Sequence, residues 1–287
     1  MPPRIAVAGI VAFWLVTTGY IAHRDLWPRL FSSGPPPVSI ELADEARQNV
    51  PANWKLLRNG EKVGKLRTQM KYIDAEDAFQ FTYRYTDLRL DQGDITLEAK
   101  EAVSEVKMTR AGELREQSMT GKVKLSLRGA QIMDGTIAVR GAVTNGVLTG
   151  RCELKSDLID LVGDLDPVEV PKNGHPLNPL QPVNRIGGVR GGLTWEVQES
   201  NPLQDAVFEL LKKKFRLPEQ KRKGSLVAQV DRAQQPLKVK GEDVSCWVIE
   251  YRRAEVVART WVRASDGKVL LQEAFEKGES LTFERED

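Results

Sequence analysis

The chain has 287 residues, of which 41% are hydrophobic and 29% are charged, a composition typical of a globular protein with a hydrophobic core. Its 42 basic and 40 acidic residues leave a formal net charge of +2. With so small a net charge, the protein as a whole has no strong positive electrostatic potential to attract nucleic acid or an acidic partner. Any electrostatic function must therefore depend on a local cluster of charges.

The N-terminal segment differs in composition from the rest of the sequence. Residues 5–22 carry no charge, Arg4 precedes them, and Trp14 and Trp27 are placed as interfacial anchors. A bilayer core is crossed by about 17–25 apolar residues, so a stretch of this length is sufficient. We therefore predict an N-terminal transmembrane helix, a signal anchor over residues 1–29.

A cleaved secretory signal peptide and a buried core helix are the two alternatives for this segment. The best cleavage site, Thr17-Thr18-Gly19, matches the A-x-A pattern poorly, and the remaining chain offers no helical partner for an all-round apolar helix. The sequence favours an uncleaved anchor in the inner (cytoplasmic) membrane. Because a single N-terminal span is the usual export device, we expect the rest of the chain on the extracytoplasmic, periplasmic side.

Residues 30–52 are predicted to form a stalk. They include Pro35, Pro36 and Pro37, a run that favours an extended and fairly stiff conformation. The folded part is expected over residues 53–287, as an extracytoplasmic antiparallel β-domain.

The first elements of this domain read as strands. Asn59-Gly60 predicts a hairpin within residues 53–73, and residues 78–88 alternate apolar and polar side chains as in a half-buried strand. One face of that strand carries an aromatic ladder, formed by Phe79, Phe81, Tyr83 and Tyr85. Residues 95–108 are rich in helix formers, but their neighbours favour a strand.

Further strands are expected up to residue 156, with turns at Ala111-Gly112, Asp134-Gly135 and Asn145-Gly146. Residues 156–192 then carry many prolines and glycines and are predicted to be a long crossing segment without regular structure.

Residues 202–215 predict the one helix of the domain. Asn201 can cap it, Pro202 suits its first position, and Gln204 can reach back as in a capping box. A single apolar stripe follows the helix through Leu203, Ala206, Val207, Leu210, Leu211 and Phe215. Strands resume after it, so the predicted fold is mainly β, a large curved antiparallel sheet, half-barrel-like, with one packed amphipathic helix.

Residues that carry enzymatic chemistry are scarce. His23 and His175 are the only histidines, too few for a metal site or for the base of a catalytic triad. The "IGGVRGG" run lacks the Lys-Ser/Thr ending of a phosphate loop, and the aspartates of "DLIDLVGDLDP" miss the spacing of a calcium loop. We predict no catalytic, metal-binding or cofactor-binding residue, and no nucleic acid partner.

Two further features, a pair of cysteines and a cluster of basic residues, each allow a functional and a purely structural interpretation. Cys152 and Cys246 form a candidate disulfide in an exported protein, or else each is a small buried hydrophobic residue. A candidate basic contact patch for lipid headgroups or an acidic protein follows the helix; its alternative is the cationic C-terminus of that helix and a solvated loop. The patch consists of Lys212, Lys213, Lys214, Arg216, Lys221, Arg222 and Lys223.

A curved sheet that is closed by one helix leaves a concave apolar face, which can hold an apolar ligand. The candidate cavity lining is Phe79, Phe81, Tyr83, Tyr85, Leu210 and Leu211. The alternative is that these side chains are ordinary core.

Three stretches resemble a known family: "WKLLRNGEKVGKLRTQMKY", "NRIGGVRGGLTWEV" with "NPLQDA" after it, and the closing "TWVRASDGKVLLQEAF.KGESLTFERE". They are similar to the half-barrels of periplasmic lipoprotein-handling proteins of the LolA/LolB type and related exported β-domains. The resemblance implies a half-barrel fold and the handling of a lipidated or hydrophobic molecule.

We therefore expect a non-enzymatic, membrane-anchored envelope protein that binds a hydrophobic ligand or a lipidated partner. One alternative is a protein–protein interaction or assembly module of the envelope, and another is an envelope hydrolase that acts through carboxylates. An apolar cavity of several hundred Å³ favours the carrier, a filled core favours the module, and two inward carboxylates about 5–10 Å apart favour the hydrolase.

Overall fold

The computed structural model describes residues 50–92, 95–109, 112–157, 160–170, 181–198, 201–215, 225–276 and 278–287. The predicted anchor (residues 1–29) and the predicted stalk up to residue 49 lie outside the described residues. Within the described ranges, no helix has the length and apolar character that a membrane crossing needs.

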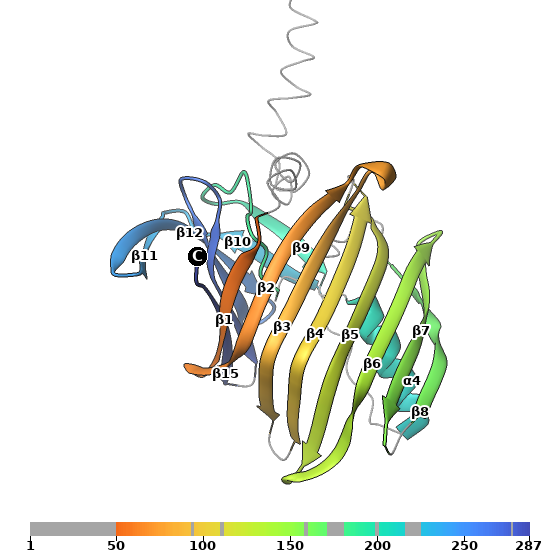
Figure 1. Ribbon diagram of the computed structural model, residues 1–287. Coiled ribbons are helices and arrows are strands. Elements are labelled where there is room, and N and C mark those ends of the chain that lie inside the picture. Colours follow the sequence, from red (N-terminus) through yellow and green to blue (C-terminus); the bar gives the residue numbers. More distant parts are fainter. Residues whose placement is uncertain are drawn as a thin grey trace, which may run out of the picture. The chain divides into compact units, whose positions relative to one another are not determined.

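The N-terminal half of the domain is a meander, in which each strand pairs antiparallel with the next along the chain (Figure 1). Long strands with alternating side chains produce this arrangement, because each buries one face against the core and leaves the other to solvent. The strands are β1 (Ala52–Arg58), β2 (Glu61–Ile73), β3 (Ala78–Gln92), β4 (Ile95–Thr109), β5 (Leu114–Leu127), β6 (Ala130–Thr144), β7 (Val147–Ser156) and β8 (Asp160–Glu169).

The C-terminal half extends the same sheet from the other side of β1. Its elements are β9 (Thr194–Gln198), α4 (Pro202–Phe215), β10 (Ser225–Val230), β11 (Gln235–Val239), β12 (Glu242–Arg252), β13 (Val256–Arg263), β14 (Val269–Glu276) and β15 (Glu279–Arg285). The described residues form one 15-stranded sheet in the order β8-β7-β6-β5-β4-β3-β2-β1-β15-β14-β13-β12-β10-β9, and β11 pairs with β12. The prediction of a large antiparallel sheet with one helix is confirmed.

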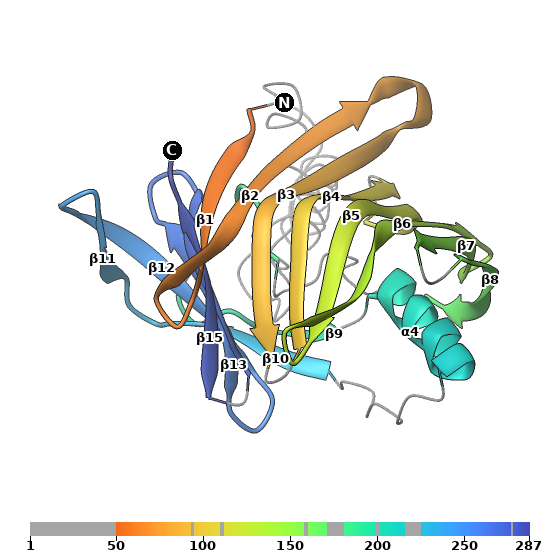
Figure 2. The ribbon, with the colours of Figure 1, turned by 60° about the horizontal axis from the view of Figure 1, so that its bottom comes forward.

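The sheet bends around one shared core (Figure 2). Buried side chains from both halves belong to the same cluster, among them Trp54 and Phe79 from the meander and Ile249 and Phe283 from the C-terminal strands. The two halves meet where β1 pairs with β15, which sets Trp54 opposite Arg285. We call the face of the sheet that packs against this core the inner face, and the opposite face of the sheet the outer face.

The predicted turns at Asn59-Gly60 and Asn145-Gly146 are confirmed, since both residues of each pair have positive φ, as a two-residue hairpin turn requires. The predicted turn at Asp134-Gly135 is wrong, because β6 runs through it and the chain reverses at Arg128-Gly129 instead. Gly135 has a different reason to be glycine: a Cβ there would collide with the carbonyl oxygen of Lys155 on β7.

The prediction that residues 156–192 lack regular structure is wrong in its first part, where β8 forms. Pro167 lies inside this strand. β8 is the last strand of the sheet, and its register shifts opposite Leu148 and Gly150 of β7, so the proline lies at a bulge of an edge strand. Strands accept proline at such positions because no ladder hydrogen bond needs its missing N–H.

The predicted helix α4 is confirmed with its bounds and its cap. The side-chain oxygen of Asn201 accepts a hydrogen bond from the Gln204 amide N–H (3.3 Å), and its amide group donates to Gln204 Oε1 (3.2 Å). The helix packs against β8, with smaller contacts to β6 and β7. The expectation that it covers the aromatic ladder on β3 is therefore wrong; it covers the other end of the meander.

Candidate functional site

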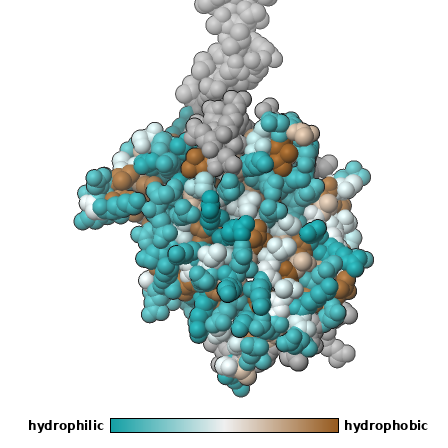
Figure 3. Space-filling view, viewed as in Figure 1, coloured by the Kyte–Doolittle hydropathy of each residue, from teal (hydrophilic) through white to brown (hydrophobic). Residues whose placement is uncertain are grey.

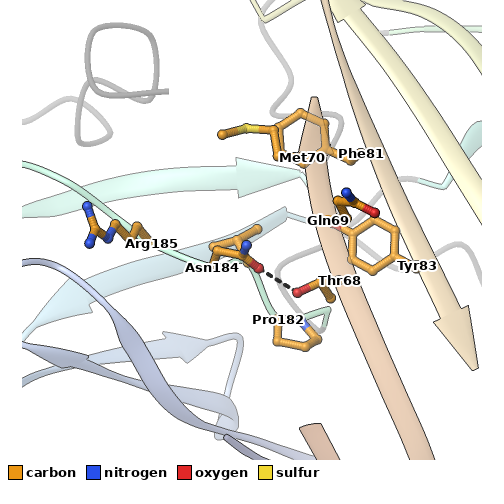
Figure 4. Close-up of a pocket in the computed structure, with 9 residues that line it drawn as sticks. Thr68, Gln69, Met70, Phe81, Tyr83, Pro182, Asn184 and Arg185 are labelled. Atoms are coloured by element: carbon orange, nitrogen blue, oxygen red, sulfur yellow. Dashed lines mark hydrogen bonds between the residues drawn. The ribbon is translucent and has the colours of Figure 1, made fainter. Parts of the chain in front are cut away.

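The aromatic ladder is part of the packed core. Phe79, Phe81 and Tyr83 are buried and Tyr85 is half-buried, all on the inner face of β3. Pro182 and Val183 of the crossing segment line one small cavity together with Phe81 and Tyr83; Figure 4 shows Pro182, Phe81 and Tyr83 around it. The cavity left between them has a volume of about 20 Å³, which is room for a single water molecule.

Leu210 lies away from this cavity, next to Gly163 of β8. The structure therefore does not bring together the predicted cavity lining of the ladder and the helix. Leu211 is in α4, but its side chain is outside the described residues.

Polar contacts fasten the crossing segment over the ladder. The indole N–H of Trp54 donates to Thr68 Oγ1 (2.9 Å), and the Thr68 hydroxyl donates in turn to Asn184 Oδ1 (Figure 4). The side-chain amide of Asn184 donates a hydrogen bond to the backbone carbonyl of Val50 (3.1 Å). The backbone carbonyl of Asn184 accepts one from Arg285 Nη1 (2.9 Å). Because strands from both halves hold Asn184, this segment has a structural role as the cover of the core.

The ladder offers no acid–base chemistry at neutral pH. Burial, together with the neighbouring Tyr85 hydroxyl, raises the pKa of Tyr83 far above its usual value. Burial also raises the pKa of Tyr85 to about 12, although a hydrogen bond from Gln181 (3.3 Å) acts in the opposite direction. Both hydroxyls therefore stay protonated.

The candidate disulfide is not formed. Cys152 lies on β7 and Cys246 on β12, and both thiols are free and buried. Burial raises the pKa of each thiol, so neither has the thiolate character of a reactive cysteine. The alternative, that each is a small buried hydrophobic residue, describes them.

The candidate basic patch cannot be placed. Lys212, Lys213 and Lys214 belong to the last turns of α4, but their side chains are outside the described residues. The other members, Arg216, Lys221, Arg222 and Lys223, also lie outside the described residues, as do the two histidines, His23 and His175.

A larger hollow lies on the outer face, across β3 to β8, with a volume of about 790 Å³. Figure 3 shows this side of the molecule, where hydrophilic residues predominate. We call it the outer hollow; it is lined by Gln80, Val103, Glu105, Lys107, Glu116, Gln117, Ser118, Thr120, Arg140, Gly141, Ala142, Thr149, Gly150, Arg151 and Asp164.

The register of the sheet explains the shape of the outer hollow. Glu105, Ser118, Arg140, Arg151 and Asp164 lie opposite one another from β4 to β8 and form a single row across the strands. Ser118, Thr120, Ala142 and Thr149 are the shorter side chains among the charged residues that line the hollow.

Lys107 closes one end of the outer hollow. Its ammonium group lies 3.0 Å from Glu76 and 3.1 Å from Glu116, and the hydrogen bond to Glu76 is the main cause of its raised pKa. Next to it, the Gln80 amide donates to Glu105 (2.9 Å). These contacts fix the side chains at this end before any ligand arrives.

The sequence did not indicate this site. Its residues come from six strands, and each strand shows only an ordinary polar outer face. Only the strand register places Glu105 and Arg140 in one row, and register over six strands cannot be derived from local patterns.

No aspartate or glutamate is among the buried side chains that the structure describes. In the same residues, no group of three or more histidine, cysteine, aspartate or glutamate side chains is placed to hold a metal ion.

No protein-family model matches this chain, and no curated protein sequence matches it. Among solved structures, the chain is similar to the beta-barrel-like protein of domain of unknown function DUF1849 from Brucella abortus. The TM-score is 0.36 at 10% sequence identity, over 82% of this chain and 94% of that chain. A TM-score this low carries no argument, so the description of the fold rests on the strands of this chain.

Proposed function

We propose that this chain is a non-enzymatic envelope protein, anchored in the membrane by residues 1–29, whose β-domain binds a partner protein through the outer hollow. The observation that carries the proposal is the contrast between the two faces. The cavity beside the ladder has about 20 Å³, whereas the outer hollow has about 790 Å³, and most of the residues that line it are of polar or charged type. Polar, hydrogen-bonding linings suit protein surfaces rather than apolar small molecules.

The carrier function that the LolA/LolB resemblance implies is the second candidate. The curved antiparallel sheet and the inward aromatic ladder favour it. A carrier of this kind requires the crossing segment to move away from the ladder, because the cavity that Pro182 and Val183 line beside Phe81 and Tyr83 has a volume of only about 20 Å³.

Site-specific photocrosslinking in cells tests the proposal. A photoreactive amino acid replaces Thr120, an exposed residue of the outer hollow, in the full chain. The matched control carries it at Lys238, an exposed residue of β11. We expect a discrete, protease-sensitive adduct from Thr120 and none from Lys238.

An environment-sensitive apolar dye, titrated against the full chain in detergent, separates the two candidates. The proposal expects no saturable binding beyond that of the detergent alone. Saturable binding that is lost in Phe81→Ala, together with the absence of a Thr120 adduct, would assign the carrier function instead.

A further inference from the structure

Several charges of the outer face are compensated across neighbouring strands. Arg84 pairs with Glu101, Arg89 with Glu98 (3.3 Å), and Lys124 with Asp134 (3.3 Å). Such cross-strand pairs are the ordinary way in which a sheet stabilises a charged face. Two charged residues that line the outer hollow, Arg140 and Glu105, lack such an ion pair in the described part of the chain.

Arg140 is the first exception. It makes no ion pair or side-chain hydrogen bond with any residue that the structure describes, and it lies directly opposite Arg151 on β7. Arg151 has one ion-pair partner there, Glu153, at 3.6 Å. Like charges that face each other across two strands are destabilising, so an anionic group above them is attracted to both.

Glu105 is the second exception. Its carboxylate accepts a hydrogen bond from the neutral Gln80 and has no cationic partner in the described part of the chain. Glu105 and Arg140 are separated by one strand, β5, which carries the short Ser118 between them. Two strand spacings amount to about 9.6 Å, which is the separation of the two strands that carry Glu105 and Arg140.

This spacing matches an extended peptide. In the polyproline II conformation, residues three positions apart lie on the same side of the chain and about 9 Å from each other. A segment that crosses the strands in this conformation sets a basic side chain over Glu105 and an acidic one over Arg140 and Arg151. The hydroxyls of Ser118, Thr120 and Thr149 line the same hollow and are available to its backbone.

We propose that the outer hollow recognises an extended, polyproline II-like segment of the partner protein that carries a basic and an acidic residue three positions apart. The inference rests on the proposed function and names the chemistry of its partner. A polyanion fits less well, because Glu105, Glu116 and Asp164 line the same hollow and repel it.

The test measures the binding of a short fluorescent proline-rich peptide, with one lysine and one aspartate three positions apart, to the full chain in detergent by fluorescence anisotropy. Comparison peptides carry the two charges on adjacent residues, or the lysine alone, or the aspartate alone. We expect saturable binding of the first peptide, and binding of each comparison peptide that is weaker by about three- to tenfold.

Three variants locate the contacts. Arg140→Gln and Glu105→Gln should each weaken binding of the first peptide by about three- to tenfold, and each should abolish the advantage over the matching single-charge peptide. The matched control is Arg84→Gln, on the same face but outside the hollow, which should leave the affinity within about twofold. Arg140→Gln also removes the repulsion from Arg151, so it should not lower the midpoint of thermal unfolding.

Absence of saturable binding, equal affinity for all the peptides, or equal losses in all three variants would overturn the inference. Its failure can be told apart from failure of the proposed function. If the Thr120 adduct forms in cells and persists unchanged in Arg140→Gln and Glu105→Gln, the partner binds the hollow by other contacts. If no adduct forms, both proposals fail.

Discussion

Tyr83, Tyr85 and Tyr251 each place a phenol inside or at the border of the core. Their local environments differ, since Tyr85 accepts a hydrogen bond from Gln181 whereas the hydroxyl of Tyr251 is paired with Thr260. Burial nevertheless dominates in all three cases and raises their pKa values, to about 12 for Tyr85 and Tyr251 and higher for Tyr83. The core therefore packs in this way only while the hydroxyl groups of these three tyrosines are protonated.

We predict that the free energy of unfolding falls between about pH 10 and pH 12. An unfolded tyrosine loses its proton near pH 10, whereas the folded domain holds these three protons to higher pH, so rising pH favours the unfolded chain. Below pH 10 these groups make no pH-dependent contribution. Absorbance at 295 nm and circular dichroism, recorded together, should show phenolate appearing as the fold is lost.

The control for this prediction is Tyr85→Phe, which removes one of the buried ionisable groups and should make the alkaline loss of stability shallower. Ionisation of all three tyrosines near pH 10 with an unchanged circular dichroism spectrum would contradict it.

Sequence reasoning at the scale of single residues identified the aromatic ladder correctly, because the alternation of residues 79–85 directly reports which side chains share a face. It could not identify what lies over them. Asn184 holds the covering segment through its bonds to Thr68 and Arg285, and those residues are far apart in sequence.

Helix α4 is anchored at its N-terminus from the sheet. Gln117 of β5 is buried, its amide donates to Asn201 Oδ1 (2.9 Å), and its oxygen accepts from the Leu203 amide N–H (3.4 Å). Gln117 thus accepts from one of the N–H groups that a helix start leaves without a partner, and it also holds the side chain of the capping residue Asn201. Beyond it, Leu203 is 4% exposed and Ala206 is fully buried, whereas Leu210 is only partly covered.

We predict that Leu203→Ala lowers the free energy of unfolding by about 2–5 kcal/mol, the range for a packed core leucine. Leu210→Ala is the matched control and should cost clearly less, because its side chain is partly exposed and lies over Gly163, which has no side chain to pack against it. Urea unfolding of both variants provides the measurement. Equal losses would mean that the helix packs along its whole length.

At the scale of elements, turn chemistry was a reliable guide where both residues of a pair adopt positive φ, as at Asn145-Gly146. It failed at Asp134-Gly135, since glycine also serves where two strands approach closely, and the sequence does not distinguish these roles. The helix was found with its ends because Asn201, Pro202 and Gln204 form a local start signal. Its packing site depends on distant strands and was not predictable.

The whole molecule has a predicted topology that is open to direct test. If residues 5–22 span the inner membrane with the domain outside, protease added to intact spheroplasts should degrade the domain, and release of the protein should need detergent rather than high salt. Immunoblotting of fractions with an antibody to the C-terminus provides the measurement. A protected domain or release by salt would refute the topology.

The large antiparallel sheet was predictable from the succession of amphipathic strands and turns. The strand order was not, because the pairing of β1 with β15 joins residues from opposite ends of the domain and leaves no local signal. The outer hollow also depends on the whole sheet, since its row of residues exists only once the five strands β4 to β8 are in register.

The pairing of β1 with β15 also has a consequence in time. The backbone N–H of Asn53 meets the side chain of Asp287, 234 positions further along the chain. At a synthesis rate of about 5–20 residues per second, β1 waits roughly 10–50 s for its second neighbour. During this interval the nascent chain exposes the edge of β1 that later pairs with β15, and such an unpaired edge can pair with other chains and aggregate. Aggregation through this edge is therefore favoured until the last strand has been made.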